Sequence, residues 1–138
     1  RGTEQALALY RRNYRPSHRH PHPQATICVW ALAADSDAEA RRLLQTREFW
    51  RVGFEKGLRQ PLVTPEFAAS YPYTADERAL IEALRRKAIA GTGDAVAGRL
   101  HELARQFELE ELVVVTWTHD AAARRRSYEL VAGACGIA

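Results

Sequence analysis

Apolar residues gather in three short runs along the chain, and a helical pattern follows each run. Residues 26–33, 88–90 and 112–115 show no alternation of apolar and polar side chains, and the first run is rich in β-branched and aromatic residues. Such runs are typical of strands that are covered on both faces. Because each strand leads into a helix, the pattern predicts an α/β fold of parallel βαβ units with right-handed crossovers.

Capping residues mark where the predicted helices begin and end. Residues 36–39 and 74–77 have the S/T-x-x-E pattern of a capping box, in which a hydroxyl and a carboxylate bind the first free N–H groups of a helix. Thr92 and Asp120 can cap two further helices. Gly57 stands where a C-terminal glycine is typical.

Two segments fall outside this alternation. Leu7, Tyr10 and Tyr14 share one face of a helical pattern, which predicts an N-terminal helix that ends before Pro16. Residues 58–73 contain several prolines and aromatic side chains, and they predict a long irregular insertion.

Length and composition indicate one domain with a buried core. The chain has 138 residues, of which 46% are hydrophobic. No apolar run approaches the roughly 20 residues of a membrane helix, and no signal peptide opens the chain. Cys28 and Cys135 lie far apart, which fits a reducing compartment, so we expect a cytoplasmic protein with Cys28 in its core. The net charge of +3 gives no nucleic-acid footprint.

Three parallel strands form an incomplete sheet. Such a sheet leaves two open edges, whereas parallel sheets are normally extended and covered on both faces. The chain also begins at Arg1 and contains no methionine. We therefore expect three consecutive βα units cut from a longer parallel fold.

Four segments, in this order along the chain, carry a family resemblance. They are a helix and turn at 6–17, the strand exit AADSDAEARRL at 33–43, the turn GTGDAV at 91–96, and a strand with its closing helix at 111–129. Together they resemble the C-terminal part of the luciferase-like flavin monooxygenases, the bacterial luciferase superfamily. The chain departs from the family pattern at Gly93, where the family has proline, and in a histidine-rich loop.

The resemblance implies both a fold and an activity. The family's fold is a TIM-type (β/α)8 barrel, so residues 1–138 would be a single fragment that holds its strands six to eight. The parent protein would be an oxidoreductase, a monooxygenase that uses reduced FMN (or a related deazaflavin) and O2 on an organic substrate. A partner reductase would supply the reduced flavin, the parent would be a homo-oligomer, and the isolated chain would be inactive.

A second hypothesis needs no catalysis. Apolar sheet edges without partner strands tend to associate with other chains. The chain would then be a non-catalytic folding or self-association module. For the chain alone we expect self-association and negligible FMN affinity, because most of the flavin pocket would be absent.

Candidate site residues follow from the resemblance. The active site of such a barrel lies at the carboxyl ends of its strands. The strand ends of this chain offer no nucleophile–base pair, carboxylate dyad or metal set, so catalytic residues stay unassigned, as suits an enzyme whose cofactor supplies the chemistry. The candidates for flavin binding are Gly91, Thr92, Gly93, Thr116 and Trp117.

Each candidate also has a structural interpretation. Glycines before a helix can expose N–H groups to a phosphate, but capping alone explains Thr92 and Asp94 would compete with an anion. Trp117 can line a flavin or substrate pocket, or it can pack beneath the last helix. Trp30, in the middle of a strand, is expected in the core.

The histidine-rich loop raises a third hypothesis, a metal-binding protein. His18, His20 and His22 lie between prolines with no cysteine or carboxylate beside them. Zinc sites require a fixed geometry and usually a fourth ligand. We therefore favour a solvated loop and expect no metal site. Arg124, Arg125 and Arg126 are expected on a solvated helix face.

Overall fold

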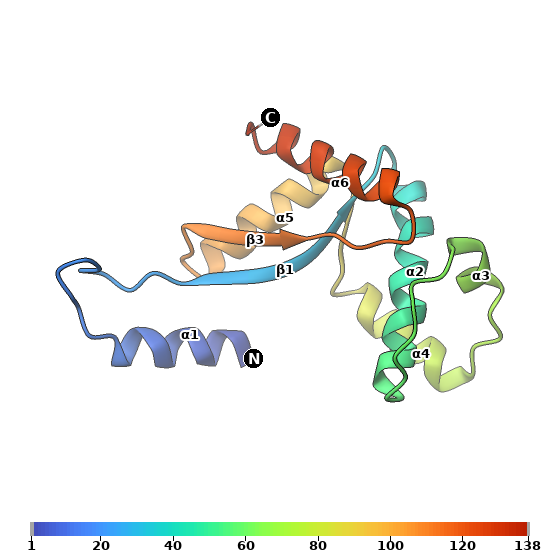
Figure 1. The fold of residues 1–138 in the computed structure, drawn as a ribbon, viewed down its shortest axis with the longest axis horizontal. Helices are drawn as coiled ribbons and strands as arrows, with labels where there is room; N and C mark the ends of the chain where they lie inside the picture. The colour runs from blue at the N-terminus through green and yellow to red at the C-terminus, as the bar shows by residue number, and fades with distance from the viewer. Residues whose placement is uncertain (1, 138) are drawn as a thin grey trace.

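The computed structural model describes residues 2–137, which form a parallel sheet of three strands with six helices around it. In chain order the elements are α1 (Gly2–Asn13), β1 (Thr26–Ala33), α2 (Asp37–Glu55), α3 (Pro65–Ser70), α4 (Ala75–Arg85), β2 (Ile89–Gly91), α5 (Gly93–Gln106), β3 (Glu111–Val115) and α6 (Ala121–Ala134) (Figure 1). The predicted α/β class is confirmed.

The order of the strands differs from the prediction. β1 lies in the centre of the sheet, between β2 and β3. Its residues 26–30 pair with β3, and its residues 31–33 pair with β2, both in parallel. Consecutive strands of a (β/α)8 barrel are neighbours, whereas β2 and β3 are separated here by β1. The eight-residue β1 is long enough to pair with the two shorter strands at different heights.

Helices cover the two faces of the sheet unequally. α5 and α6 pack on one face and form a core cluster with β1, made of Ala31, Ala33, Val96, Leu100 and Val131. α2 packs on the opposite face near the carboxyl end, where the cluster consists of Leu32, Ala34, Ala40, Leu43, Leu44 and Ala88. In Figure 1, α2, α3 and α4 group at this end, away from α1.

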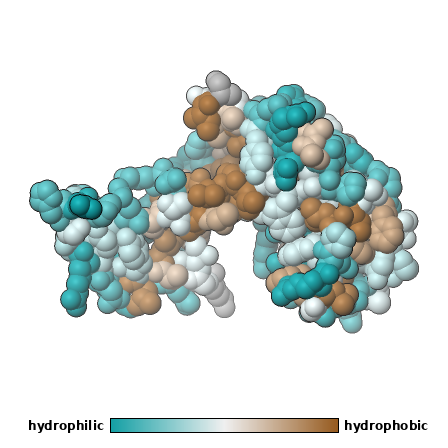
Figure 2. Space-filling view, viewed as in Figure 1, coloured by the Kyte–Doolittle hydropathy of each residue, from teal (hydrophilic) through white to brown (hydrophobic). Residues whose placement is uncertain are grey.

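On the same face as α2, the amino-terminal half of β1 is open, because α2 covers only the carboxyl end of the strand. Residues 26–30 are exposed or half-buried, and only residues 31–33 are buried. Cys28 is exposed, so its predicted place in the core is wrong. Val113 pairs with Cys28 and is 44% exposed. An apolar patch accordingly lies over β1 and β3 in Figure 2.

The helix caps are present, with one difference. Thr74 and Glu77 form both bonds of a capping box at α4. Ser36 accepts a hydrogen bond from the Glu39 N–H at 3.1 Å, but the Glu39 carboxylate binds Arg42 at 2.8 Å instead of returning to the cap. The second half of the predicted box at 36–39 is therefore replaced by an ion pair. Gly57 follows α2 with a φ of 77°, as its role predicts.

The insertion at 58–73 is more regular than predicted, because it contains α3. Thr64 caps this helix and Pro65 is its first residue. The ring of Phe49 in α2 lies 5.5 Å from that of Phe67 and 5.1 Å from that of Tyr71, centroid to centroid. These aromatic contacts hold the insertion against α2.

The N-terminal helix ends at Asn13, before Pro16, as predicted. Of the predicted face, Leu7 is buried, but Tyr10 is 39% exposed. The Tyr10 hydroxyl donates to the Gln24 carbonyl at 3.0 Å, which holds α1 beside the segment that enters β1.

Candidate functional site

The carboxyl edge of the sheet carries all five predicted site residues. Gly91, Thr92 and Gly93 lie where β2 passes into α5, and Thr116 and Trp117 directly follow β3. Because β1 separates β2 from β3, the two groups stand on opposite sides of the central strand. The structure therefore brings them to one edge but not into one cluster.

The glycine turn has a structural role that accounts for its residues. The Thr92 hydroxyl caps α5 by accepting from the Ala95 N–H at 3.4 Å. A Cβ atom at Gly93 would lie 2.8 Å from the Leu130 carbonyl oxygen, so glycine allows α5 to approach α6 closely. The adjoining cavity of about 420 Å³ is lined by the acidic residues Asp94 and Glu129, and negative charges there oppose a bound anion.

Thr116 continues the sheet beyond the end of β3. Its hydroxyl donates to the Ala31 carbonyl at 2.7 Å, and its N–H donates to the Tyr128 hydroxyl at 2.9 Å. Close by, the Ser127 hydroxyl accepts from the Ala33 N–H at 2.8 Å. Thr116 and Ser127 are 3% and 0% exposed. Both side chains therefore satisfy backbone hydrogen-bonding groups of β1, and neither faces a ligand.

Trp117 belongs to a cluster of aromatic rings on the α2 face of the sheet. Its ring centroid lies 4.8 Å from that of Trp50 and 6.4 Å from that of Trp30. Trp50 in turn stacks on Phe54 at 5.0 Å. The half-buried Trp117 thus packs against α2 and β1, whereas one of its two predicted places was beneath the last helix. Trp30 is half-buried in the same cluster, so its predicted place in the core is only partly confirmed.

An arginine lies among these rings. The guanidinium carbon of Arg47 lies 4.3 Å from the centroid of the Trp30 ring and 5.7 Å from that of the Trp117 ring, which are cation–π distances. Burial, and then the nearby charge of Arg51, lower the pKa of Arg47 to about 10. At neutral pH the side chain is therefore still a cation. We call Trp30, Arg47, Trp50, Phe54 and Trp117 the arginine–aromatic cluster.

Arg47, Trp50 and Phe54 did not stand out in the sequence as candidate site residues. Their positions share one face of a helix, because they are three and four residues apart. That spacing was visible, but it is shared by many solvated helix faces. Only the arrival of Trp30 and Trp117 from two strands makes this face distinctive.

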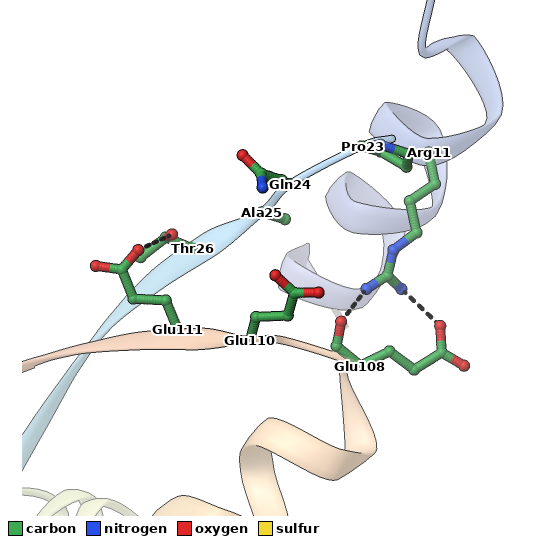
Figure 3. Close-up of a pocket in the computed structure, with 8 residues that line it drawn as sticks. All are labelled: Arg11, Pro23, Gln24, Ala25, Thr26, Glu108, Glu110 and Glu111. Carbon is green, nitrogen blue, oxygen red and sulfur yellow. Dashed lines mark hydrogen bonds and ion pairs between the residues drawn. The ribbon is translucent and has the colours of Figure 1, made fainter. Parts of the chain in front are cut away.

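A cavity of about 450 Å³ lies at the opposite, amino-terminal edge of the sheet (Figure 3). Arg11 crosses it to the carbonyl oxygen and the carboxylate of Glu108, at 2.9 and 3.5 Å. Glu111 accepts from the Thr26 hydroxyl at 3.3 Å. These contacts account for Arg11, Glu108, Thr26 and Glu111, and Glu110 adds a further carboxylate to the lining.

Residues 2–137 contain neither a cluster of metal-binding side chains nor a helix that could cross a membrane. No three histidine, cysteine or carboxylate side chains within this range stand close enough together to hold a metal ion. His18, His20 and His22 are exposed. None of the helices in the same range combines the length and the hydropathy that a membrane crossing needs.

The chain is similar in sequence to one part of several longer proteins. No family model matches it. It is 32% identical over 129 residues to the uncharacterized protein YceB of Bacillus subtilis, and 29% identical over 126 residues to a luciferase-like monooxygenase of Escherichia coli K12. The alignments cover 94% and 91% of this chain, but only 39% and 38% of the two relatives.

A solved structure resembles almost the whole chain. The crystal structure of apo-MsnO8 matches it with a TM-score of 0.83 and 27% sequence identity, over 99% of this chain and 42% of that one. The chain is therefore a distant relative of a luciferase-like monooxygenase, and its fold recurs as a part of a larger structure.

Proposed function

We propose that the chain is the C-terminal part of a flavin-dependent monooxygenase of the luciferase-like class. The observation that carries the proposal is the 29% identity to the luciferase-like monooxygenase of Escherichia coli over 91% of the chain. The four motifs at 6–17, 33–43, 91–96 and 111–129 support it, because they occur in the order that the family resemblance requires.

The strand order supports a specific place in a (β/α)8 barrel. β1 and β3 pair over residues 26–30 and share α5 and α6 on one face, as neighbouring barrel strands share their outer helices. β2 is only three residues long and pairs with the last residues of β1. We assign β2, with α2, α3 and α4, to an insertion at the top of the barrel. The chain then contributes two barrel strands instead of the three that we expected.

The chain's own residues fit a flavin site at this edge. The arginine–aromatic cluster offers large apolar ring faces beside the Arg47 cation, and Arg51 and Arg59 lie over the Phe54 ring. This combination suits a planar ring system that carries polar substituents. A bound reduced flavin would supply the reaction with O2. Trp117 would exclude water from it. The side chains of Thr92 and Thr116 are engaged in the fold, so contacts from Gly91, Thr92, Gly93 and Thr116, which also belong to the proposal, would have to come from the main chain. FMN from a partner reductase, and a homo-oligomeric parent, belong to the same proposal.

The test uses the complete protein that contains this chain. With reduced FMN and O2, we expect flavin-dependent oxygen consumption that rises when an organic substrate is oxidised. Trp117→Ala should weaken flavin binding at least about tenfold, because it removes a ring face. Tyr10→Ala, an aromatic deletion on α1, is the matched control. A complete protein that binds no flavin would rule the proposal out.

The isolated chain provides a second measurement. Because most of the pocket would lie on other strands, calorimetric titration of residues 1–138 with FMN should show negligible heat. A micromolar affinity for FMN would mean that residues 1–138 themselves hold most of the flavin-binding site.

The alternative is a folding or self-association module without activity. The open apolar face at Cys28 and Val113 favours it, because such a face tends to find a partner. Oxygen consumption by the complete protein separates the two candidates.

A further inference from the structure

Arg47 is a cation without a counter-ion. It lies against Trp30 and Trp117, and its side chain is half-buried. Over residues 2–137 no carboxylate comes within salt-bridge distance of its guanidinium. An arginine that is desolvated on its faces and unpaired at its N–H edge is unusual, because a buried charge is normally paired.

Two acidic side chains of the same helix are already engaged. Glu48, the next residue, is 4% exposed and receives two hydrogen bonds from Arg85, each 2.8 Å long. Glu55 binds Arg51 at 2.6 Å. Glu48 therefore offsets the charge of Arg47 only in part and forms no ion pair with it, and Arg51, one turn away, adds repulsion.

Buried donors without partners occur in and beside the arginine–aromatic cluster. The ring N–H of Trp30 and the Nε–H groups of Arg47 and Arg51 have no hydrogen-bond partner among the residues that the structure describes, and neither has the buried hydroxyl of Thr118, which can also accept. Tryptophan and arginine side chains can only donate hydrogen bonds. Buried donors of this kind are normally satisfied, and the group that would complement them is an acceptor with negative charge.

We propose that the arginine–aromatic cluster binds an organic acid. Its carboxylate would pair with the free N–H edge of Arg47, and its apolar body would lie on the rings of Trp50 and Trp117. An inorganic anion would leave those rings unused. This inference rests on the proposed function only in taking the acid to be the substrate of the monooxygenase, and the binding can be measured without flavin.

The three tryptophans make the binding directly observable. The chain contains three tryptophans, and all of them belong to this cluster. We would titrate residues 1–138 with benzoate and record tryptophan fluorescence. The expected result is a saturable change with benzoate, and an affinity at least about tenfold lower for the neutral isostere benzamide, because charge-assisted hydrogen bonds need the carboxylate. Equal affinities, or no saturable change, would overturn the proposal.

Substitutions of Arg47 test whether this side chain binds the carboxylate. Arg47→Gln should lower the affinity for benzoate at least about tenfold, and Arg47→Lys should lower it less, because lysine keeps the charge but loses the planar fork. Arg41→Gln, an exposed position on the same helix, should leave the affinity unchanged. Circular dichroism checks the fold of each variant, and Arg47→Lys serves if Arg47→Gln does not fold. Unchanged affinity in a folded Arg47 variant would overturn the proposal.

Two outcomes separate this inference from the proposed function. If the complete protein binds benzoate but shows no flavin-dependent oxygen consumption, the proposed acid site stands and the proposed monooxygenase activity is excluded. Oxygen consumption without benzoate binding would do the reverse.

Discussion

At the scale of single residues, two hydroxyl groups complete the sheet where β3 has already ended. Thr116 binds the carbonyl of Ala31, and Ser127 binds the N–H of Ala33. β3 reaches only as far as Trp30 in the ladder, so without these side chains the last residues of β1 would have unpaired backbone groups on that edge. One predicted site residue, Thr116, thus acts in the sheet itself.

We predict that Ser127→Ala destabilises the protein by about 1–3 kcal/mol, because it leaves the buried Ala33 N–H without an acceptor. Urea denaturation measures the change. The control is Ser70→Ala, whose hydroxyl is bonded at an exposed site, and we expect it to stay within about 0.5 kcal/mol. Equal effects of the two substitutions would contradict the role of Ser127.

The carboxylate of Glu77 gives a pH prediction. Its hydrogen bond from Lys56, and then the one from the Thr74 N–H, lower the pKa of Glu77 below its ordinary 4.5. A carboxylate with a lowered pKa stabilises the folded state above its unfolded pKa, and that stability is lost as the pH falls through the folded value.

We therefore expect the melting temperature to fall as the pH is lowered from 6 toward 3, and Glu77→Gln to make that fall shallower. Thermal unfolding followed by circular dichroism at several pH values measures both curves. Parallel curves for the two proteins would show that Glu77 does not contribute to the acid sensitivity.

At the scale of elements, the contact between α5 and α6 depends on one glycine. The Leu130 carbonyl of α6 stands where a side chain at Gly93 would be. Gly98, on the same helix, faces open space. A side chain would therefore clash with α6 at Gly93, whereas it would meet no neighbour at Gly98.

We predict that Gly93→Ala costs about 1–3 kcal/mol, as overpacked contacts do. Gly98→Ala, in contrast, should raise the stability by up to about 1 kcal/mol, because alanine favours helices. Chemical denaturation of both variants measures the difference. A stabilising Gly93→Ala would mean that α5 and α6 adjust freely.

The helices also show which structural features can be predicted from local sequence. The capping residues Thr74, Thr92 and Asp120 were predicted correctly, because a cap binds N–H groups only two or three residues away. The helix α3 was not predicted, although Thr64 and Pro65 provide a local start signal for it. The prolines around it favoured an irregular segment, and its contact with Phe49 of α2 is not visible in a local pattern.

At the scale of the whole molecule, the sheet is covered on one face and only partly covered on the other. Residues 26–30 of β1 have no partner on the edge away from β3, and β3 has none on its outer edge, within the part of the chain that the structure describes. Val113 adds an exposed apolar side chain to this region.

We predict that the isolated chain self-associates through this region, since unpaired edges and apolar patches attract partners. Sedimentation at roughly tens of micromolar should show more than a monomer, and Val113→Lys should shift the protein toward the monomer because it places a charge in the patch. Leu58→Lys, which places the same charge on an exposed apolar residue outside the sheet, is the control. A clean monomer of the unmodified chain would refute the prediction.

The sequence by itself determined the strands, most of the helices and their caps. These features depend on side-chain periodicity and on hydrogen bonds between residues a few positions apart. The tertiary structure alone decided the central place of β1, the bonds from Thr116 and Ser127, and the meeting of Arg47 with Trp30 and Trp117. Those contacts join segments far apart in the sequence, and the physical reason is that they depend on which strand edges pair and which face each helix covers.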